Sequence, residues 1–433
     1  MNLFPVISTC TLIFLASFNA FGGAHASDNE LTELKQTLDD AMSRIAEFEA
    51  SDQTVVKSSW SDRIRLKGDF RYRYQNGETT DRLDALNLPI GDRDRNRQRV
   101  RARADLIADI HEDIEVGFGV ATGGDDPVST NQTLGGAGSS KGLQMDLAYM
   151  NWKLSNNSGL YLGKFKNQFS DVAGTGILWD SDWRPEGFNT TYEKDNFYAN
   201  FLGTWLTADG SSGSGSSFNY GLQIGVTTKI SDAKVDVGAG IYRIKGENRQ
   251  CYNASSDRLG DDCFGNTEFD HFGAVAAGGG FYGMDYSPMQ LFGKAALNTV
   301  IPVTIFFDYI VNLDAKLIPN GPSAGQKLDS AYLIGASLGY AKQQGEWQIK
   351  GYYQEKEADS LLGLLTESDF AGGGTDSEGL VFKAKYMLKD AVTLQATYLM
   401  GERQDSNGYE NGNTNTSNPY DVDILQLDVK FKY

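Results

Sequence analysis

The sequence has 433 residues, a formal net charge of −18, 49 glycines, 9 prolines and an aromatic content of 12%. A chain with this negative charge repels polyanions, so nucleic acid is not an expected partner. The glycine and aromatic content indicates a β-protein rich in turns and argues against a disordered chain.

Residues 1–26 have the features of a secretory signal peptide. The apolar run CTLIFLASFNAF is too short to span a bilayer as a helix, and the small-residue cleavage motif Ala24-His25-Ala26 follows it. No Lys or Arg precedes the run, which is unusual for a signal. We expect export and a mature chain that begins at Ser27. No later stretch reaches 18 apolar residues, so no transmembrane helix is expected.

The next segment, 27–57, contains a predicted helix over 28–50 with an apolar repeat of seven residues. This repeat is typical of a coiled coil, although three heptads are marginal without help from an attached domain. A lone amphipathic helix lying on the next domain is the alternative. The predicted seam residues are Leu31, Leu34, Leu38, Ala41, Ile45 and Phe48.

After Trp60 the apolar period changes from 3.5 to 2, which is the period of a β-strand. In DRIRLKGDFRYRYQ, apolar residues such as Phe70 and Tyr72 alternate with charged ones. The pattern predicts sixteen strands, near residues 62–76, 94–110, 112–122, 142–154, 158–168, 186–194, 196–208, 217–230, 233–246, 286–298, 301–314, 328–343, 346–357, 377–388, 391–404 and 421–433.

The stretch RDRNRQRVRARADLIADI places an arginine at every second position from Arg93 to Arg103. On a helix, residues two apart point about 200° apart, so these arginines would not form a row. On a strand they share one face. The strand pattern of the neighbouring residues favours the second interpretation.

The connections between predicted strands alternate in length. Short ones such as HED, SNNSG and QQGE alternate with long ones, 77–93, 123–141, 169–185, 247–285, 315–327, 358–376 and 405–420. This sorting is typical of a transmembrane β-barrel, with an apolar face toward lipid and a polar face inward. A sixteen-stranded barrel encloses water. The predicted pore-lining basic residues are Arg65, Arg71, Arg73, Arg97, Arg99, Arg101 and Arg103.

The last strand, DILQLDVKFKY, alternates strictly and ends in an aromatic residue, Tyr433. It resembles the C-terminal assembly signal of bacterial outer-membrane proteins. Together with GDFRYRYQ…RDRNRQRVRARADL and GKFKNQFSDVAGTGILWDSDWRPEGF, it makes the chain resemble the trimeric bacterial porins, and more closely the group labelled putative porins.

This resemblance implies a sixteen-stranded, all-β antiparallel transmembrane barrel over 58–433 in the Gram-negative outer membrane. The preceding coiled-coil segment would then lie in the periplasm. A homotrimer in contact with lipid and lipopolysaccharide is also implied. The loop after the fifth strand would fold inward and place Asp171, Asp180, Asp182 and Glu186 near a constriction, opposite basic wall residues. The PEFGG-like element of the best-known general porins is absent, and WDSDWRPEG is also compatible with an ordinary surface turn.

Two cysteines, Cys251 and Cys263, remain after the signal peptide. Two cysteines close together in an exported chain predict a disulfide. A zinc site would need further ligands, and only His271 is near in sequence. Only three histidines exist, which makes a Ser–His–acid site or a histidine-rich metal site hard to build. We therefore expect no catalytic site, no metal and no cofactor.

Three functions remain open. A general porin would pass small hydrophilic solutes by diffusion, and this is the primary hypothesis. A substrate-selective channel would use the arginine row as a track for anions. A barrel that acts as a tether or adhesin would conduct little and would use its coil to bind periplasmic partners. Single-channel conductance separates the three.

Overall fold

The computed structural model describes residues 60–80, 94–208, 217–247, 263–269, 281–318, 323–404 and 419–433, with residues 249 and 251 and part of 32–44. The chain divides into two units, Met1–Arg63 and Ile64–Tyr433. In the first unit the described residues between 32 and 44 are helical, and a 3₁₀ helix, η2 (Trp60–Arg63), ends the unit. The predicted signal peptide and all six predicted seam residues lie outside the described residues, so both remain predictions. Among the described helices, none has the length and apolar character needed to cross a membrane.

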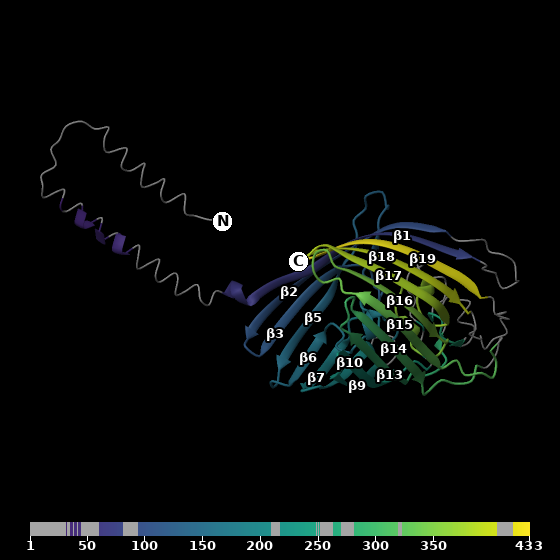
Figure 1. The fold of residues 1–433 in the computed structure, drawn as a ribbon. Helices are drawn as coiled ribbons and strands as arrows, with labels where there is room; N and C mark the ends of the chain where they lie inside the picture. The colour runs from purple at the N-terminus through teal and green to yellow at the C-terminus, as the bar shows by residue number, and fades with distance from the viewer. Residues whose placement is uncertain are drawn as a thin grey trace. The chain divides into compact units, whose positions relative to one another are not determined.

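In the described part of the second unit, sixteen long strands form a closed antiparallel barrel (Figure 1). Each long strand hydrogen-bonds to the next long strand in the sequence, and β1 pairs with β19 to close the ring. The long strands are β1 (Ile64–Thr80), β2 (Arg95–His111), β3 (Ile114–Thr122), β5 (Leu143–Lys153), β6 (Ser158–Lys164), β7 (Glu186–Lys194), β8 (Phe197–Thr207), β9 (Ser217–Ile230), β10 (Ala233–Arg243), β13 (Pro288–Leu297), β14 (Val303–Asn312), β15 (Ser330–Gly339), β16 (Trp347–Lys356), β17 (Ser377–Lys389), β18 (Val392–Arg403) and β19 (Tyr420–Lys432).

The closure of the ring involves Tyr433. Its backbone amide and carbonyl pair with those of Gly68 at 3.2 and 2.9 Å, and its hydroxyl donates to the carbonyl oxygen of Arg103 at 2.8 Å. A Cβ at Gly68 would lie 2.5 Å from the Tyr433 ring, so only glycine fits there. Pairing of every edge is what a bilayer demands, because lipid cannot hydrogen-bond a free strand edge.

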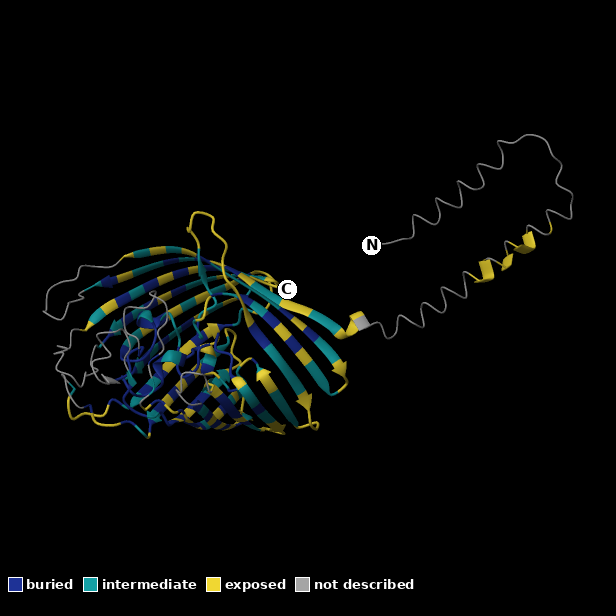
Figure 2. Ribbon diagram, turned by 180° about the vertical axis from the view of Figure 1, so that it is seen from behind, coloured by how far each residue is buried: buried dark blue, intermediate teal, exposed yellow. Residues whose placement is uncertain are grey.

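Buried and exposed residues alternate along the strands (Figure 2), and on β1 and β2 the exposed residues are largely apolar while charged ones are buried. Phe70, Tyr72 and Leu106 are 38%, 40% and 47% exposed, whereas Arg71 and Arg73 are 7% and 4% exposed. A soluble sheet would show the reverse. The buried charged residues of β1 and β2 therefore have the parity opposite to the exposed apolar ones.

Much of the apolar core lies inside the barrel and comes from two connections. One lies between β6 and β7, residues 165–185, and is called here the first inner loop. The other lies between β16 and β17, residues 357–376, and is called the second inner loop. Their buried apolar residues include Phe165, Phe169, Ile177, Trp179, Trp183, Leu361, Leu365 and Phe370.

All sixteen predicted strands are present, with ends displaced by a few residues. The strand predicted near 158–168 ends early, at Lys164, because the chain leaves the sheet there, and the amide of Phe165 donates to the carbonyl of Pro185 at 3.1 Å. Sequence reasoning missed the short elements β4 (Gln132–Thr133), β11 (Glu268–Phe269), β12 (Phe281–Tyr282), η3 (Val172–Gly174), η5 (Gly363–Leu365) and η6 (Phe370–Gly372).

Candidate functional site

The first inner loop crosses the interior from one wall to another. Near its start, the amide of Ser170 donates to Oε1 of Gln223 on β9 at 2.6 Å. Near its end, Arg184 Nε lies 3.2 Å from a carboxylate oxygen of Asp146 on β5. The inward fold that the sequence left open is therefore present, and the alternative of an ordinary surface turn is wrong.

Aromatic packing explains why this loop lies inside. The rings of Trp179 and Trp183 stack with centroids 4.6 Å apart, and Tyr242 of β10 meets Trp179 edge-on at 5.3 Å. Phe169 packs on Tyr242 at 5.1 Å. Such rings bury a large apolar area and gain about 0.5–1.5 kcal/mol from each favourable pair. The wall turns mainly polar residues inward, so the loop supplies the apolar side chains that pack inside the barrel.

The second inner loop fastens onto the first by backbone contacts. The amide of Asp180 donates to the carbonyl of Leu365 at 2.8 Å, and the amide of Glu367 donates to the carbonyl of Gly176 at 3.0 Å. The amide of Ser368 donates to Oδ2 of Asp180 at 3.1 Å. Among the described connections, the second inner loop therefore enters the interior together with the first. No sequence signal indicated the second.

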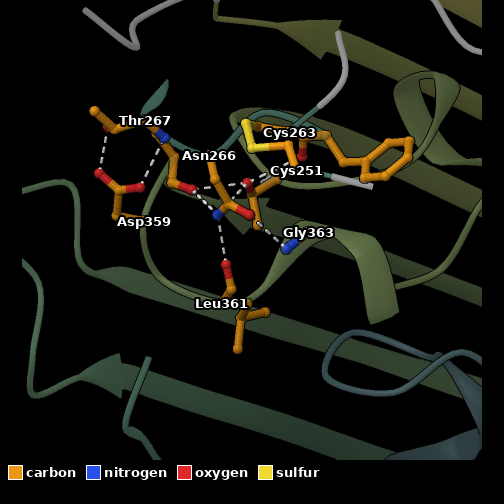
Figure 3. Close-up of a disulfide and its surroundings, with 10 residues drawn as sticks. Cys251, Cys263, Asn266, Thr267, Asp359, Leu361 and Gly363 are labelled. Atoms are coloured by element: carbon orange, nitrogen blue, oxygen red, sulfur yellow. Dashed lines mark hydrogen bonds between the residues drawn. A yellow bond between two sulfur atoms is a disulfide. The ribbon is translucent and has the colours of Figure 1, made fainter. Parts of the chain in front are cut away.

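A disulfide joins Cys251 and Cys263, the predicted pair, and the residues that follow Cys263 lie against the second inner loop (Figure 3). The side-chain amide of Asn266 donates to the carbonyl of Leu361 at 2.6 Å, and the amide of Thr267 donates to Oδ1 of Asp359 at 2.9 Å. Residues 263–267 are called here the tether. Burial raises the pKa of Asp359 to about 7, although both bonds from Thr267 oppose that shift.

The arginine row of β2 meets the first inner loop through one carboxylate. Arg103 Nη2 lies 2.6 Å from Oδ1 of Asp182, and Arg101 Nη1 lies 3.5 Å from the same atom. Asp69 of β1 takes a second contact from each, at 2.7 Å with Arg101 and 3.9 Å with Arg103. The charges of these two arginines are therefore balanced within the wall and its loop.

The arginines further along the wall meet the second inner loop. Arg73 donates to both oxygens of Asp428 at 2.7 and 3.0 Å and to Asp369 at 2.9 Å. Arg99 Nη1 lies 3.9 Å from Asp369 and donates to Gln75 at 3.2 Å. Asp369 thus lies close to Arg73 and Arg99, as Asp182 lies close to Arg101 and Arg103. Each carboxylate links one inner loop to two arginines of the wall.

The carboxyls of the inner loops fall into two classes by their pKa. Burial would raise the pKa of Asp182, but Arg103 and Arg101 outweigh it and lower that pKa below its usual range. Burial raises the pKa of Asp180 well above its usual range, and Asp182 adds to that shift. The pKa of Asp369 is lowered because Arg73 and Arg99 outweigh its burial. Asp182 and Asp369 are therefore the strongly charged acids of the loops.

The remaining predicted site residues have other surroundings. Asp171 accepts from the amides of Thr175 and Gly176 in its own loop, and Glu186, the first residue of β7, lies 2.6 Å from Lys164 of β6. Neither meets an arginine of the predicted row. Three predicted arginines complete the set: Arg71 is buried and donates to Asn131, Arg97 is half-buried in β2, and Arg65 lies 2.8 and 2.7 Å from Asp109 and Glu115.

Asp182 lines two cavities. The first, of about 270 Å³, is rich in basic groups, and the second, of about 320 Å³, is rich in acids. Basic residues lining the first are Arg71, Arg73, Arg101, Lys350, Lys383, Lys385 and Lys430. Acids lining the second are Asp125, Asp126, Asp146, Asp182 and Glu186. Sequence reasoning missed Lys350, Lys383 and Lys385, although they have the inward parity of β16 and β17.

Within the described part of the chain, one group of potential metal ligands lies close enough to share an ion. It consists of the exposed neighbours His111, Glu112 and Asp113 at the turn between β2 and β3. Ligands for a structural or catalytic metal are normally enclosed and supported by further hydrogen bonds. This exposed turn does not have that environment.

Comparison with known proteins gives a consistent picture. A sequence family described as "Putative porin" matches residues 78–274 and 283–433. Among solved structures, the chain is similar to Pseudomonas putida OprB, with a TM-score of 0.53 and 9% identity, covering 86% of this chain and 95% of that one. It is also similar to Salmonella typhi OmpF, with a TM-score of 0.46 and 10% identity, covering 87% and 99%. No curated protein matches the chain. The likeness to OprB shows a shared fold.

Proposed function

We propose, from the premise that this chain belongs to the "Putative porin" family, that its barrel passes small hydrophilic solutes and ions by passive diffusion. The family and the barrel fold support an outer-membrane porin channel. The proposal adds how the channel selects what passes.

One observation carries the proposal: two oppositely charged cavities lie beside the same inner loop, within a polar lumen. A barrel of sixteen strands is wide enough for a water-filled lumen. The inner loops reduce the width of that lumen. Ions and polar solutes exchange hydration for these charged groups, whereas an apolar solute gains nothing there. The arrangement therefore favours small hydrophilic solutes.

Planar-bilayer recording of the purified protein tests this function. We expect a conductance that rises in proportion to salt concentration, together with swelling of protein-containing liposomes in small neutral sugars. A protein that inserts but neither conducts nor admits sugars would refute diffusion and would favour the tether.

Export by the N-terminal signal and assembly as a homotrimer in lipid and lipopolysaccharide belong to the same proposal. Outer-membrane insertion requires passage across the inner membrane, and residues 1–26 supply a signal sequence. Deleting residues 28–50 should weaken the oligomer on semi-denaturing gels while each barrel still inserts. An oligomer of unchanged stability would show that the coiled coil does not contribute to assembly.

A further inference from the structure

We propose that the basic cavity is a binding site for a small organic anion of the carboxylate or phosphate class, formed by Lys350 of β16 and by Lys383 and Lys385 of β17. The inference rests on the proposed channel function, because the pore is the route by which a solute reaches the site. It differs from the arginine track that the sequence suggested, since the binding groups lie on other strands.

The first reason is that these lysines form no ion pair with the described acids. In the residues that the structure describes, none of the three lies within ion-pair distance of an acid, whereas Arg73, Arg101 and Arg103 each do. Two further basic groups border the cavity. Arg71 donates to the neutral Asn131, and Lys430 lies 3.4 Å from Asp428, whose two oxygens already accept from Arg73.

Neutral groups hold the lysines in position. Lys350 donates to the carbonyl of Ala173 in the first inner loop, and its Nζ lies 5.9 Å from the centre of the Phe306 ring. Lys383 Nζ lies 5.6 Å from the centre of the Tyr352 ring. A carbonyl or an aromatic face attracts a cation without cancelling its charge. These contacts therefore position Lys350 and Lys383 without placing them in an ion pair.

The acids that border the same cavity are already engaged. Asp182 and Asp369 pair with the arginines. Asp180 and Glu367 accept from backbone amides of the loops, at 2.7 Å from Asp182 and 2.6 Å from Phe370 respectively. The cavity has seven basic groups against five acidic ones, and two of those acids are bound to arginines.

The chemistry of the site limits the ligand. Several close cations repel one another unless an anion lies among them. Lysine ammonium groups act as compact point charges, so they bind carboxylates and phosphates without demanding a planar, bidentate shape. The volume of about 270 Å³ fits inorganic phosphate or a short dicarboxylate. Binding must stay weak enough for release, as in any conducting site.

The test compares the wild type with Lys350→Gln/Lys383→Gln/Lys385→Gln. Equilibrium dialysis in detergent measures binding of radiolabelled inorganic phosphate and its displacement by succinate, with the uncharged isostere succinamide as the reference. We expect saturable binding that succinate displaces and succinamide does not. Loss of charge-assisted contacts should weaken the affinity about tenfold or more in the triple variant. Reversal potentials in a salt gradient should shift toward cations.

The matched control is Lys294→Gln on β13, where the lysine has the same inward parity but lies 3.1 Å from Asp236. It should retain wild-type binding and selectivity. If the triple variant fails to fold, Lys385→Gln alone is measured instead. We expect it to bind phosphate more weakly than the wild type, with a smaller loss of affinity than the triple variant. Wild-type binding that is absent, or unchanged in the lysine variants, would overturn the site. Because dialysis does not depend on conduction, a protein that binds phosphate but carries no current would refute the diffusion function and leave the site standing.

Discussion

The two basic walls of the lumen differ in how their charge is used. On β1 and β2, Arg73, Arg101 and Arg103 are paired with acids from the inner loops and from the wall itself, whereas Arg71 donates to the neutral Asn131. On β16 and β17 the lysines meet carbonyls and aromatic rings. The conspicuous arginine row therefore fastens the loops, while the less conspicuous lysines supply the field that a solute meets. Counting cations in the sequence does not reveal this division.

The choice of side chain fits each role. A guanidinium offers several donors in a rigid fork and stays charged when buried, so it suits a fixed pair such as Arg73 with Asp428. An ammonium group on a flexible stem can follow a passing anion. Paired arginines should thus govern stability, and unpaired lysines should govern selectivity. The predictions below test that division in order of expected effect.

The largest effect is expected from Asp182→Asn. The substitution leaves Arg101 and Arg103 facing a neutral amide in a largely buried site, and breaking a buried pair in this way costs about 3–5 kcal/mol. Urea unfolding in detergent should show the loss, and the freed arginines should shift reversal potentials toward anions. The matched control is Asp171→Asn, which removes a loop acid that accepts from backbone amides and meets no arginine. Equal losses in both variants would show that the pairing itself contributes nothing.

Removing the disulfide should have the next largest effect. Cys251→Ser/Cys263→Ser releases the tether from its loop constraint, worth roughly 3 kcal/mol at most by chain entropy. The second inner loop, with its Asp369, should then exchange amide hydrogens faster. In part of the population Arg73 would then lack its contact with Asp369. Its charge would be less fully paired, as the charges of the lysines on β16 and β17 are. Amide hydrogen exchange over 357–376 measures this loosening of the second inner loop, with strand β1 as the internal reference. Unchanged exchange would mean that the tether does not hold the loop.

The same tether should respond to pH. Burial raises the pKa of Asp359 to about 7, above its value in an unfolded chain. The folded state then binds the extra proton, so the stability of the tether is greatest near pH 4 and falls as pH rises toward 7, beyond which it levels off. Protease resistance of the tether, followed from pH 5 to pH 8, should show this decline. Asp359→Asn should remove the slope, and a slope that persists in the variant would place the titrating group elsewhere.

The barrel was predictable from sequence for a local reason. A strand with one lipid face and one water face must alternate residue by residue, so each of the sixteen strands carries its own signal. The inward parity of Arg99, Arg101 and Arg103 followed directly from this alternation. The first inner loop could be expected because the sequence resembles the trimeric porins, in which the loop after the fifth strand folds inward.

The partners of these residues were not predictable. Arg73 meets Asp369 across 296 positions, and Arg101 meets Asp182 across 81, so no local pattern links them. Most of the second inner loop, LLGLLTESDFAGGG (361–374), shows neither the apolar period of a helix nor that of a strand. Whether a cation is paired depends on which loop enters the barrel, and loop entry is a tertiary property. The wall partners of Asp171 and Glu186 could not be named from the sequence either: Asp171 lines the cavity that Lys350 and Lys383 also line, and Glu186 lies 2.6 Å from Lys164.

The smallest effect is expected from Glu186→Gln, and it sharpens the comparison from the opposite side. Lys164 and Glu186 form an ion pair 2.6 Å apart, but the glutamate side chain is 62% exposed, so water and salt screen the attraction. Such a pair contributes about 0.2–1 kcal/mol. Unfolding in urea should therefore change little, and reversal potentials should stay near those of the wild type. If breaking this exposed pair lowered the free energy of unfolding as much as breaking the pair of Arg103 with Asp182, burial would not explain the difference between the two walls.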